Sequence, residues 1–197
     1  MTGQIAYRPL AEADLPLMAD WLNRPHLRAF YQREPISLAA VAAKYGPRIR
    51  REVPTHSWLA ILAGAPFGYL QCYRVADWAD WRGTIGVDHG VSIDLFIGEA
   101  ALIGHGVGRR MLAGYVDQVA FPQHPDERLC WIGHELENAA ARGCSAAAGF
   151  VPVREYVEDG ARCVLMVRQL FSRTDDLKND PLHGILRRSS SAARAAR

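Results

Sequence analysis

The sequence has little that would tie it to a membrane. No run of eighteen apolar residues occurs among the 197 residues, so no membrane-spanning helix is expected. The first eight residues, MTGQIAYR, lack the charged-then-apolar order of a signal peptide. We therefore expect a cytoplasmic protein that does not work at a membrane.

Metal ligands and paired cysteines are also scarce. None of the four cysteines has a neighbour at the spacing of a zinc site; they are Cys72, Cys130, Cys144 and Cys163. The seven histidines are scattered and form no His-x-x-x-His pair. We expect free thiols in a reducing compartment and no metal site.

An excess of positive charge is found only at the C-terminal end of the sequence. The net charge is +2, but six of the 23 basic and three of the 21 acidic residues lie from Ser172 onward, which leaves the body at −1. We therefore predict a single domain over residues 1–171 and a flexible basic tail over residues 172–197. An arm that binds nucleic acid is the alternative, but no aromatic residues are interleaved for base stacking.

What is present is typical of a globular protein with a sizeable core, since 49% of the residues are hydrophobic and 22% are charged. The first half predicts a short strand, two helices and a hairpin, with an acidic, tryptophan-rich segment expected as a functional loop or a second short hairpin. The strand covers residues 7–10 and the first helix residues 14–22. The second helix covers residues 38–45 and ends near Gly46-Pro47, and a separate basic helical stretch follows at 48–51. The hairpin strands cover residues 58–62 and 67–73, and the acidic segment covers residues 77–89.

The second half alternates strands and helices. Residues 91–97 alternate with a period of two, so that Val91, Ile93, Leu95 and Ile97 face one way and Ser92, Asp94 and Phe96 the other. A glycine loop then precedes an amphipathic helix from Val107 to Val119. A strand at 129–132, a helix capped by Asn138 and ending at Gly149, and a hairpin over 151–168 follow. The order indicates a mixed α/β or α+β sheet protein.

The glycine loop, Ile103-Gly104-His105-Gly106-Val107-Gly108, is a candidate phosphate site. The first amides of a helix have no intrahelical partner, and glycines let phosphate oxygens approach the backbone. The loop is neither a P-loop nor a dinucleotide fingerprint, because Gly-Lys-Ser/Thr and the Gly-x-Gly-x-x-Gly spacing are both missing. Glycines that serve only close packing remain the alternative.

The strand 91–97 and the loop 103–110 together resemble the acetyl-CoA signature of the GNAT superfamily of N-acetyltransferases. Asn138 and Ala148-Gly149-Phe150 resemble the downstream Asn…Gly-Phe segment of that family. The resemblance implies a mixed, mostly antiparallel central sheet, flanked by helices and splayed at the acetyl-CoA site. It implies acetyl-CoA as co-substrate, held by Leu95, Phe96, Ile97, Ile103, Gly104, His105, Gly106, Val107, Gly108, Arg109 and Asn138.

Within the superfamily the chain is similar to the aminoglycoside 6′-N-acetyltransferases. The matching stretches are residues 7–10, 20–26 (Asp-Trp-Leu-Asn-Arg-Pro-His), 45–48, 68–73 and 93–94. Three positions depart from the pattern: Ile103 replaces a Gln or Arg, Ser145 replaces a Tyr that protonates the departing thiolate, and residues 132–135 replace an acidic-Pro segment. The general acid is therefore Ser145, a water or no dedicated group.

Asp94 is the lone carboxylate in an apolar strand, so we predict that it acts as base or amine anchor when an amine attacks the thioester directly in a ternary complex. A structural carboxylate is the alternative. A polycationic amine needs an acidic, aromatic pocket, for which the candidates are Asp77, Trp78, Asp80, Trp81, Asp88, Glu135 and Tyr31. A solvated loop whose tryptophans pack on the sheet would explain the 77–88 cluster equally well.

The resemblance thus predicts acetyl transfer to the 6′-amine of an aminoglycoside antibiotic, which would confer resistance, by a monomer or homodimer. Two alternatives stay open. One is acylation of a siderophore-precursor (hydroxylysine-type) amine or a polyamine, and the other is a CoA-binding module without catalysis.

Overall fold

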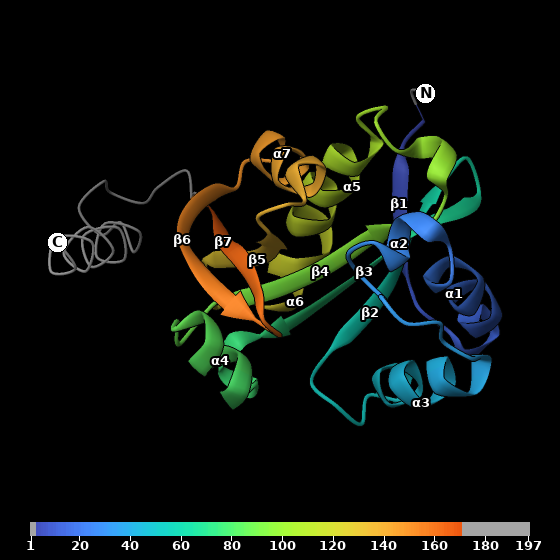
Figure 1. The fold of residues 1–197 in the computed structure, drawn as a ribbon, viewed down its shortest axis with the longest axis horizontal. Coiled ribbons are helices and arrows are strands. Elements are labelled where there is room, and N and C mark those ends of the chain that lie inside the picture. Colours follow the sequence, from blue (N-terminus) through green and yellow to red (C-terminus); the bar gives the residue numbers. More distant parts are fainter. Residues whose placement is uncertain (1–2, 171–197) are drawn as a thin grey trace, which may run out of the picture.

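The computed structural model of the protein describes residues 3–170, and the predicted basic tail lies outside the described residues. Seven strands form one sheet in the order β1-β2-β3-β4-β5-β7-β6 (Figure 1). Neighbouring strands are antiparallel except for the parallel pair β4–β5, so the expected mixed, mostly antiparallel sheet is confirmed. The strands are β1 (Ile5–Pro9), β2 (His56–Leu62), β3 (Ala65–Arg74), β4 (Val91–Ile97), β5 (Leu129–Glu135), β6 (Val151–Glu158) and β7 (Ala161–Gln169).

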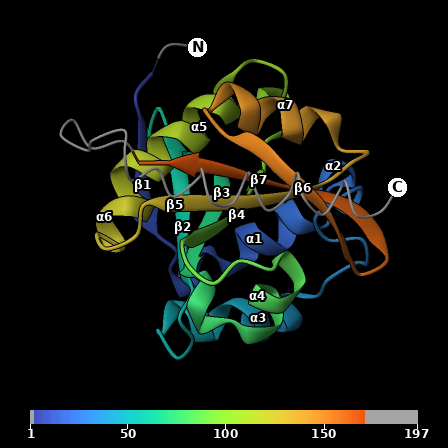
Figure 2. The same cartoon turned by 90° about the vertical axis from the view of Figure 1, so that its left-hand side faces the viewer.

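Helices cover both faces of the sheet. Figure 2 shows α5 and α7 over one face and α1, α3 and α4 over the other. The helices are α1 (Leu15–Leu22), α2 (Pro25–Arg28), α3 (Leu38–Ile49), α4 (Ala79–Ile85), α5 (Val107–Tyr115), α6 (Phe121–Gln123) and α7 (Ala139–Ala147), and a π-helical turn, Val116–Ala120, joins α5 to α6. No helix in residues 3–170 is long and apolar enough to span a membrane.

The sheet is splayed between β4 and β5. These strands pair only at Val91–Cys130 and Ser92–Trp131. Beyond that point β4 stays paired with β3 as far as Ile97, while β5 stays paired with β7 as far as Glu135. The two halves of the sheet therefore separate over the last residues of β4 and β5, as the family resemblance implied.

The hydrophobic core divides at the same sheet. Val91 and Ile93 pack among the residues beneath α5, whereas Phe96 packs with α1 and α3 on the opposite face. The period-two alternation expected for β4 is therefore confirmed. It places Asp94 on the face of α1 and α3, and Leu95 and Ile97 on the face of α5.

Two elements differ from the expectation. The helix α3 continues past Gly46-Pro47 to Ile49, so the predicted end near residue 46 and the separate basic stretch are wrong. Pro47 lies in the last turn, and Arg48 bonds to the Gln71 side chain, which stabilises that turn from outside the helix. The segment 77–89 contains the helix α4 rather than a hairpin, because Trp81 and Ile85, one turn apart, both pack against the sheet.

Candidate functional site

The end of β4 is held by the Asp-Trp-Leu-Asn-Arg-Pro-His run. Trp21 Nε1 donates to Glu99 Oε1 at 2.8 Å, and Arg24 Nη1 donates to the Gly98 carbonyl at 2.8 Å. His26 Nε2 lies 3.0 Å from the carbonyl oxygen of Ile97. A Cβ atom at Gly98 would lie 2.2 Å from the Trp21 ring. This run therefore serves to position the strand end and the loop that follows.

The glycine loop has the geometry of an anion cradle. Gly104 and Gly106 have φ angles of +82° and +72°, and a Cβ atom built on either meets nothing within 4 Å. Gly106 is the N-cap of α5, and the Arg110 amide is the first to donate back, to the Gly106 carbonyl at 3.4 Å. The amides of Val107, Gly108 and Arg109 precede that bond, so they lie at the positive end of the helix. A phosphate group fits this open backbone.

The other residues predicted for the cofactor lie in the loop itself, on β4 and at the start of α7. Ile103 and His105 are exposed, and His105 Nδ1 lies 2.9 Å from the Ile103 carbonyl oxygen. Leu95 and Ile97 lie on the stretch of β4 that no longer pairs with β5, while Phe96 is buried on the opposite face. Asn138 caps α7, since its Oδ1 accepts from the Ala141 amide at 3.1 Å. Gly108 packs α5 against α7, because a Cβ atom there would lie 3.1 Å from Cys144 Sγ.

Asp94 lies at one end of a hydrogen-bond network. Gln71 Nε2 donates to Asp94 Oδ2 at 2.6 Å, and Gln71 Oε1 accepts from Arg48 Nη1 at 2.6 Å and from the Tyr69 hydroxyl at 2.7 Å. Burial raises the pKa of Asp94, and the Gln71 hydrogen bond and the charges of Arg48 and Lys44 oppose that rise. The carboxyl group is thus desolvated, and its directed partners offset part of the resulting rise in its pKa.

Other carboxylates and aromatic rings gather around Asp94. Burial, and next the charge of Asp94, raise the pKa of Glu158, and the charge of Glu135 adds to the rise. The Tyr31 ring lies 4.8 Å from that of Phe96, the neighbour of Asp94 in β4. We call this region the Asp94 side; it comprises Asp94, Glu135, Glu158, Gln71, Tyr31, Tyr73, Trp81 and Tyr156. It is acidic and aromatic, as a site for a cationic ligand requires.

The two predicted tryptophans of the 77–89 segment lie at the edge of this region. Trp81 Nε1 donates to Ser92 Oγ at 3.0 Å, and its ring meets that of Tyr156 edge-on at 5.9 Å. Trp78 is 37% exposed and contacts Tyr73 edge-on at 6.0 Å. Trp81 therefore closes the point where β4 and β5 separate, and Trp78 lies one ring further out.

The aspartates of that segment are not brought together. Asp88 is 89% exposed at its side chain and lies 3.7 Å from Arg82 within the same segment. The charge of Asp77 acts on Arg74 and His124 rather than on the Asp94 side. Asp80 is exposed in the first turn of α4. Only Glu135, among the predicted acidic residues besides Asp94, belongs to the cluster, and it also bonds to Arg33 at 2.6 Å.

Ser145 is 1% exposed within α7, and its Oγ lies 2.7 Å from Nε2 of His134 on β5. Burial, and to a lesser extent the charge of Arg142, lower the pKa of His134 to about 4. The imidazole is therefore neutral near pH 7. Ser145 and His134 both fall at positions that depart from the family pattern, and the fold places them in contact.

Several residues of the site were not among the sequence candidates, above all Glu158, Gln71, His134 and Tyr156. Glu158 and Tyr156 alternate on β6, so a period-two pattern could have placed them on one face. The glycine at position 133, inside a strand, is a second sequence signal, because it indicates a close approach by another group. In the structure that group is the Tyr156 hydroxyl, which would lie 2.0 Å from a Cβ atom at Gly133. The Gln71–Asp94 contact carries no local signal, because it depends on the pairing of β3 with β4.

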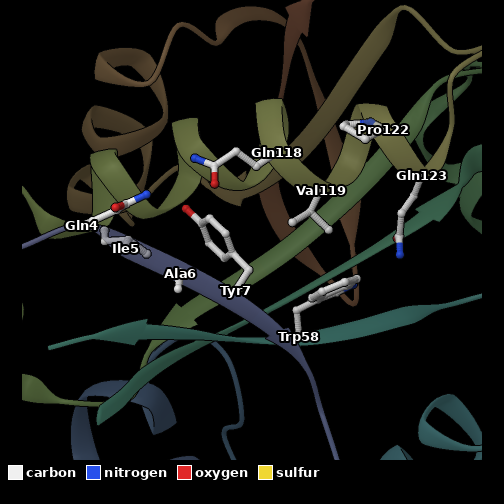
Figure 3. A pocket seen from close by; sticks show the side chains of 9 residues that line it. All are labelled: Gln4, Ile5, Ala6, Tyr7, Trp58, Gln118, Val119, Pro122 and Gln123. Carbon is white, nitrogen blue, oxygen red and sulfur yellow. The ribbon is translucent and has the colours of Figure 1, made fainter. Parts of the chain in front are cut away.

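A surface hollow of about 380 Å³ lies away from both groups of residues. Figure 3 shows that Tyr7 and Trp58 reach it from β1 and β2, and that Gln118, Val119 and Pro122 reach it from the helical side. The Tyr7 hydroxyl donates to the Met111 carbonyl at 2.7 Å. The hollow is near the C-terminal part of the α5–α6 segment, whereas the glycine loop is at the N-terminus of α5. It holds none of the carboxylates or glycines described above.

Comparison with known proteins gives the family and the relatives of the chain. The sequence model of the acetyltransferase (GNAT) domain family matches residues 11–157. An aminoglycoside N(6′)-acetyltransferase type 1 from Klebsiella pneumoniae is 28% identical over 175 residues, which is 86% of each chain. A structure of AAC(6′)-Ib with paromomycin and acetyl-CoA superposes with a TM-score of 0.76 at 25% identity, covering 88% of this chain and 99% of that one. Another, with coenzyme A and kanamycin, has a TM-score of 0.74 at 25% identity, covering 84% and 95%.

Proposed function

Because the chain belongs to the GNAT acetyltransferase family, whose acyl donor is acetyl-CoA, we propose that it acetylates the 6′-amino group of an aminoglycoside. The observation that carries the proposal is the partly buried Asp94 carboxylate, whose charge raises the pKa of Glu158 within an aromatic wall. Carboxylates that repel each other bind a cation between them favourably. The named relatives, which act at the same amine, support this acceptor.

The glycine loop would hold the pyrophosphate of the donor. We assign this role to the amides of Val107, Gly108 and Arg109, with Gly104 and Gly106 giving phosphate oxygens access to the backbone. Leu95 and Ile97, on the stretch of β4 that no longer pairs with β5, would carry the pantetheine arm. When bound, acetyl-CoA supplies an activated acetyl carbonyl. Of the remaining cofactor candidates, Ile103 and His105 belong to the loop of the cradle, Asn138 caps α7, and Phe96 packs on the opposite face of the sheet.

On the Asp94 side, the carboxylate would anchor the attacking amine and accept its proton. The ammonium group first loses a proton to solvent, because a neutral amine is the nucleophile. As the nitrogen bonds to the acetyl carbon it loses a second proton, which a desolvated carboxylate with a raised pKa is suited to accept. Gln71 fixes the carboxylate through a 2.6 Å bond. Trp81, Trp78 and Tyr31 would offer flat faces to the sugar rings, while Glu135 and Glu158 pair with further ammonium groups. Asp77, Asp80 and Asp88 have no such role in this proposal.

An amine panel tests the proposal. Purified protein and acetyl-CoA are combined with kanamycin, tobramycin, hydroxylysine or spermidine, free thiol is measured, and the product is mapped by NMR. We expect turnover with the two aminoglycosides and an acetyl group on the 6′-nitrogen. Turnover only with hydroxylysine or spermidine would move the function to the siderophore-precursor or polyamine class. CoA binding without turnover of any amine would leave a non-catalytic module.

A further inference from the structure

His134 and Ser145 form an isolated hydrogen-bonded pair at the end of β5. His134 lies beyond the last β4–β5 pair, on the stretch where the sheet has separated. Ser145 lies above it in α7, with its Oγ 2.7 Å from His134 Nε2. Ser145 is 1% exposed, whereas His134 is only partly buried. Of the two side chains, the imidazole is therefore the one that a ligand in the splayed region can reach.

The burial of Ser145 determines which nitrogen of His134 carries the hydrogen. A buried hydroxyl has to donate its hydrogen, and among residues 3–170 the acceptor found for Ser145 is His134 Nε2. The hydroxyl therefore donates to Nε2, and the hydrogen of the neutral ring resides on Nδ1. Within the same residues Nδ1 has no hydrogen-bond partner of its own. The pair thus presents an oriented, unused N–H donor.

The charges around the ring keep it neutral. Burial lowers the pKa of His134 to about 4, and the positive charge of Arg142 on α7 acts in the same direction. A neutral imidazole holds its remaining N–H hydrogen far more tightly than a thiol, whose ordinary pKa is about 8.5. The ring can therefore donate a hydrogen bond to a thiolate without losing its hydrogen.

We propose that His134 Nδ1–H is the hydrogen-bond donor that stabilises the departing thiolate of coenzyme A, and that Ser145 is a positioning residue that sets the tautomer of His134. This rests on the proposed acetyl transfer. As the amine nitrogen bonds to the acetyl carbon, the carbon–sulfur bond breaks and its electron pair stays on sulfur. His134 shares its N–H with that sulfur, Asp94 takes the amine proton, and solvent later protonates the thiolate.

Two substitutions at His134 separate the two nitrogens. His134→Asn places an amide N–H near the position of Nδ1, whereas His134→Gln places its amide near Nε2 and keeps only the contact to Ser145. The readout is the affinity for coenzyme A and for desulfo-coenzyme A, by calorimetry at pH 7 and pH 9. At pH 9 we expect the wild type and His134→Asn to favour coenzyme A, and His134→Gln to lose about tenfold of that preference.

Desulfo-coenzyme A is the control, because it lacks the sulfur but occupies the same cradle. Equal affinity of all variants for it shows that fold and cradle are intact, independently of any acceptor amine. The proposal is overturned if His134→Gln keeps the wild-type preference, or if His134→Asn loses as much as His134→Gln. If His134→Gln does not bind desulfo-coenzyme A, Ser145→Ala decides in its place. We expect Ser145→Ala to lower the preference for coenzyme A, and an unchanged preference would overturn the proposal.

Discussion

The two sides of the splayed sheet are built in opposite ways. The glycine loop is a continuous segment in which backbone amides and missing side chains make the site, with Gly104 and Gly106 at positive φ. The Asp94 side is assembled from β3, β4, β5, β6 and the helices α3 and α4, and side chains make it. The first side suits a ligand recognised through phosphate oxygens, and the second suits a cation recognised through carboxylates and rings.

Because of this difference, we expect substitutions on the two sides to affect different steps. A backbone cradle depends on the φ angle at a few glycines and on the start of one helix, so its failures should appear in donor binding. A side-chain cluster shares its task among several carboxylates, of which only Asp94 is tied to the buried Gln71–Arg48–Tyr69 network. We therefore expect one large effect and several small ones on the Asp94 side.

The largest effect is expected for Asp94→Asn. The amide keeps the shape but cannot accept a proton, so kcat/KM for the acceptor should fall by at least about 100-fold. In the wild type, burial raises the pKa of Asp94, and kcat/KM should fall as the pH decreases through that raised pKa. Steady-state kinetics from pH 5 to 9 measure both. Asp80→Asn, in exposed α4, is the control, and full activity of Asp94→Asn would remove Asp94 from the chemistry.

The next effect belongs to the other side. Gly106→Ala adds a methyl group where phosphate oxygens approach and forces alanine to a φ of +72°. We expect KM for acetyl-CoA to rise about tenfold with kcat little changed, and stability to fall by about 1–2 kcal/mol. Gly64→Ala is the matched control, because Gly64 has a φ of +81° and equally open space but lies in the β2–β3 turn. An equal rise in KM for both variants would show that strain alone is responsible.

The contrast also explains what the sequence could predict. The period-two pattern of residues 91–97, the Asn138 cap and the C-terminal Gly149 are local signals, and all three appear in the structure. The splay followed from the family resemblance. The end of α3 could not be read locally, because Arg48 obtains its partners from β3, 23 residues away in the case of Gln71.

The Asp94 side was also harder to predict from the sequence, because its residues come together through contacts between distant parts of the chain. A cluster of aspartates in one segment suggested a pocket, yet Asp77 and Asp88 face other partners in the folded chain. Glu158 instead joins Asp94 because β7 and β6 follow β5 in the sheet, an order that depends on long-range pairing. Acidic residues that are close in the sequence therefore need not form one acidic site when their segment folds as an exposed helix.

Glu158→Gln tests whether the acidic cluster binds the acceptor. Loss of one carboxylate removes an ion pair with an ammonium group, so KM for kanamycin should rise by about three- to tenfold while kcat and the KM for acetyl-CoA stay the same. Glu155→Gln is the control on the same strand, since Glu155 is exposed and bonds to Arg162 at 2.7 Å. If both variants shift the KM for kanamycin equally, net surface charge rather than a defined subsite is responsible.

The smallest expected effect concerns Lys44, whose positive charge lowers the pKa of Asp94. Lys44→Met removes that charge, so the pKa of Asp94 should rise further and the acid limb of kcat/KM should move to higher pH. On the alkaline plateau kcat/KM should change by less than about twofold, because part of the lysine charge is screened by solvent. Lys44→Arg keeps the charge and should keep the wild-type limb. An acid limb that stays in place in Lys44→Met would show that the charge of Lys44 does not act on the group that titrates.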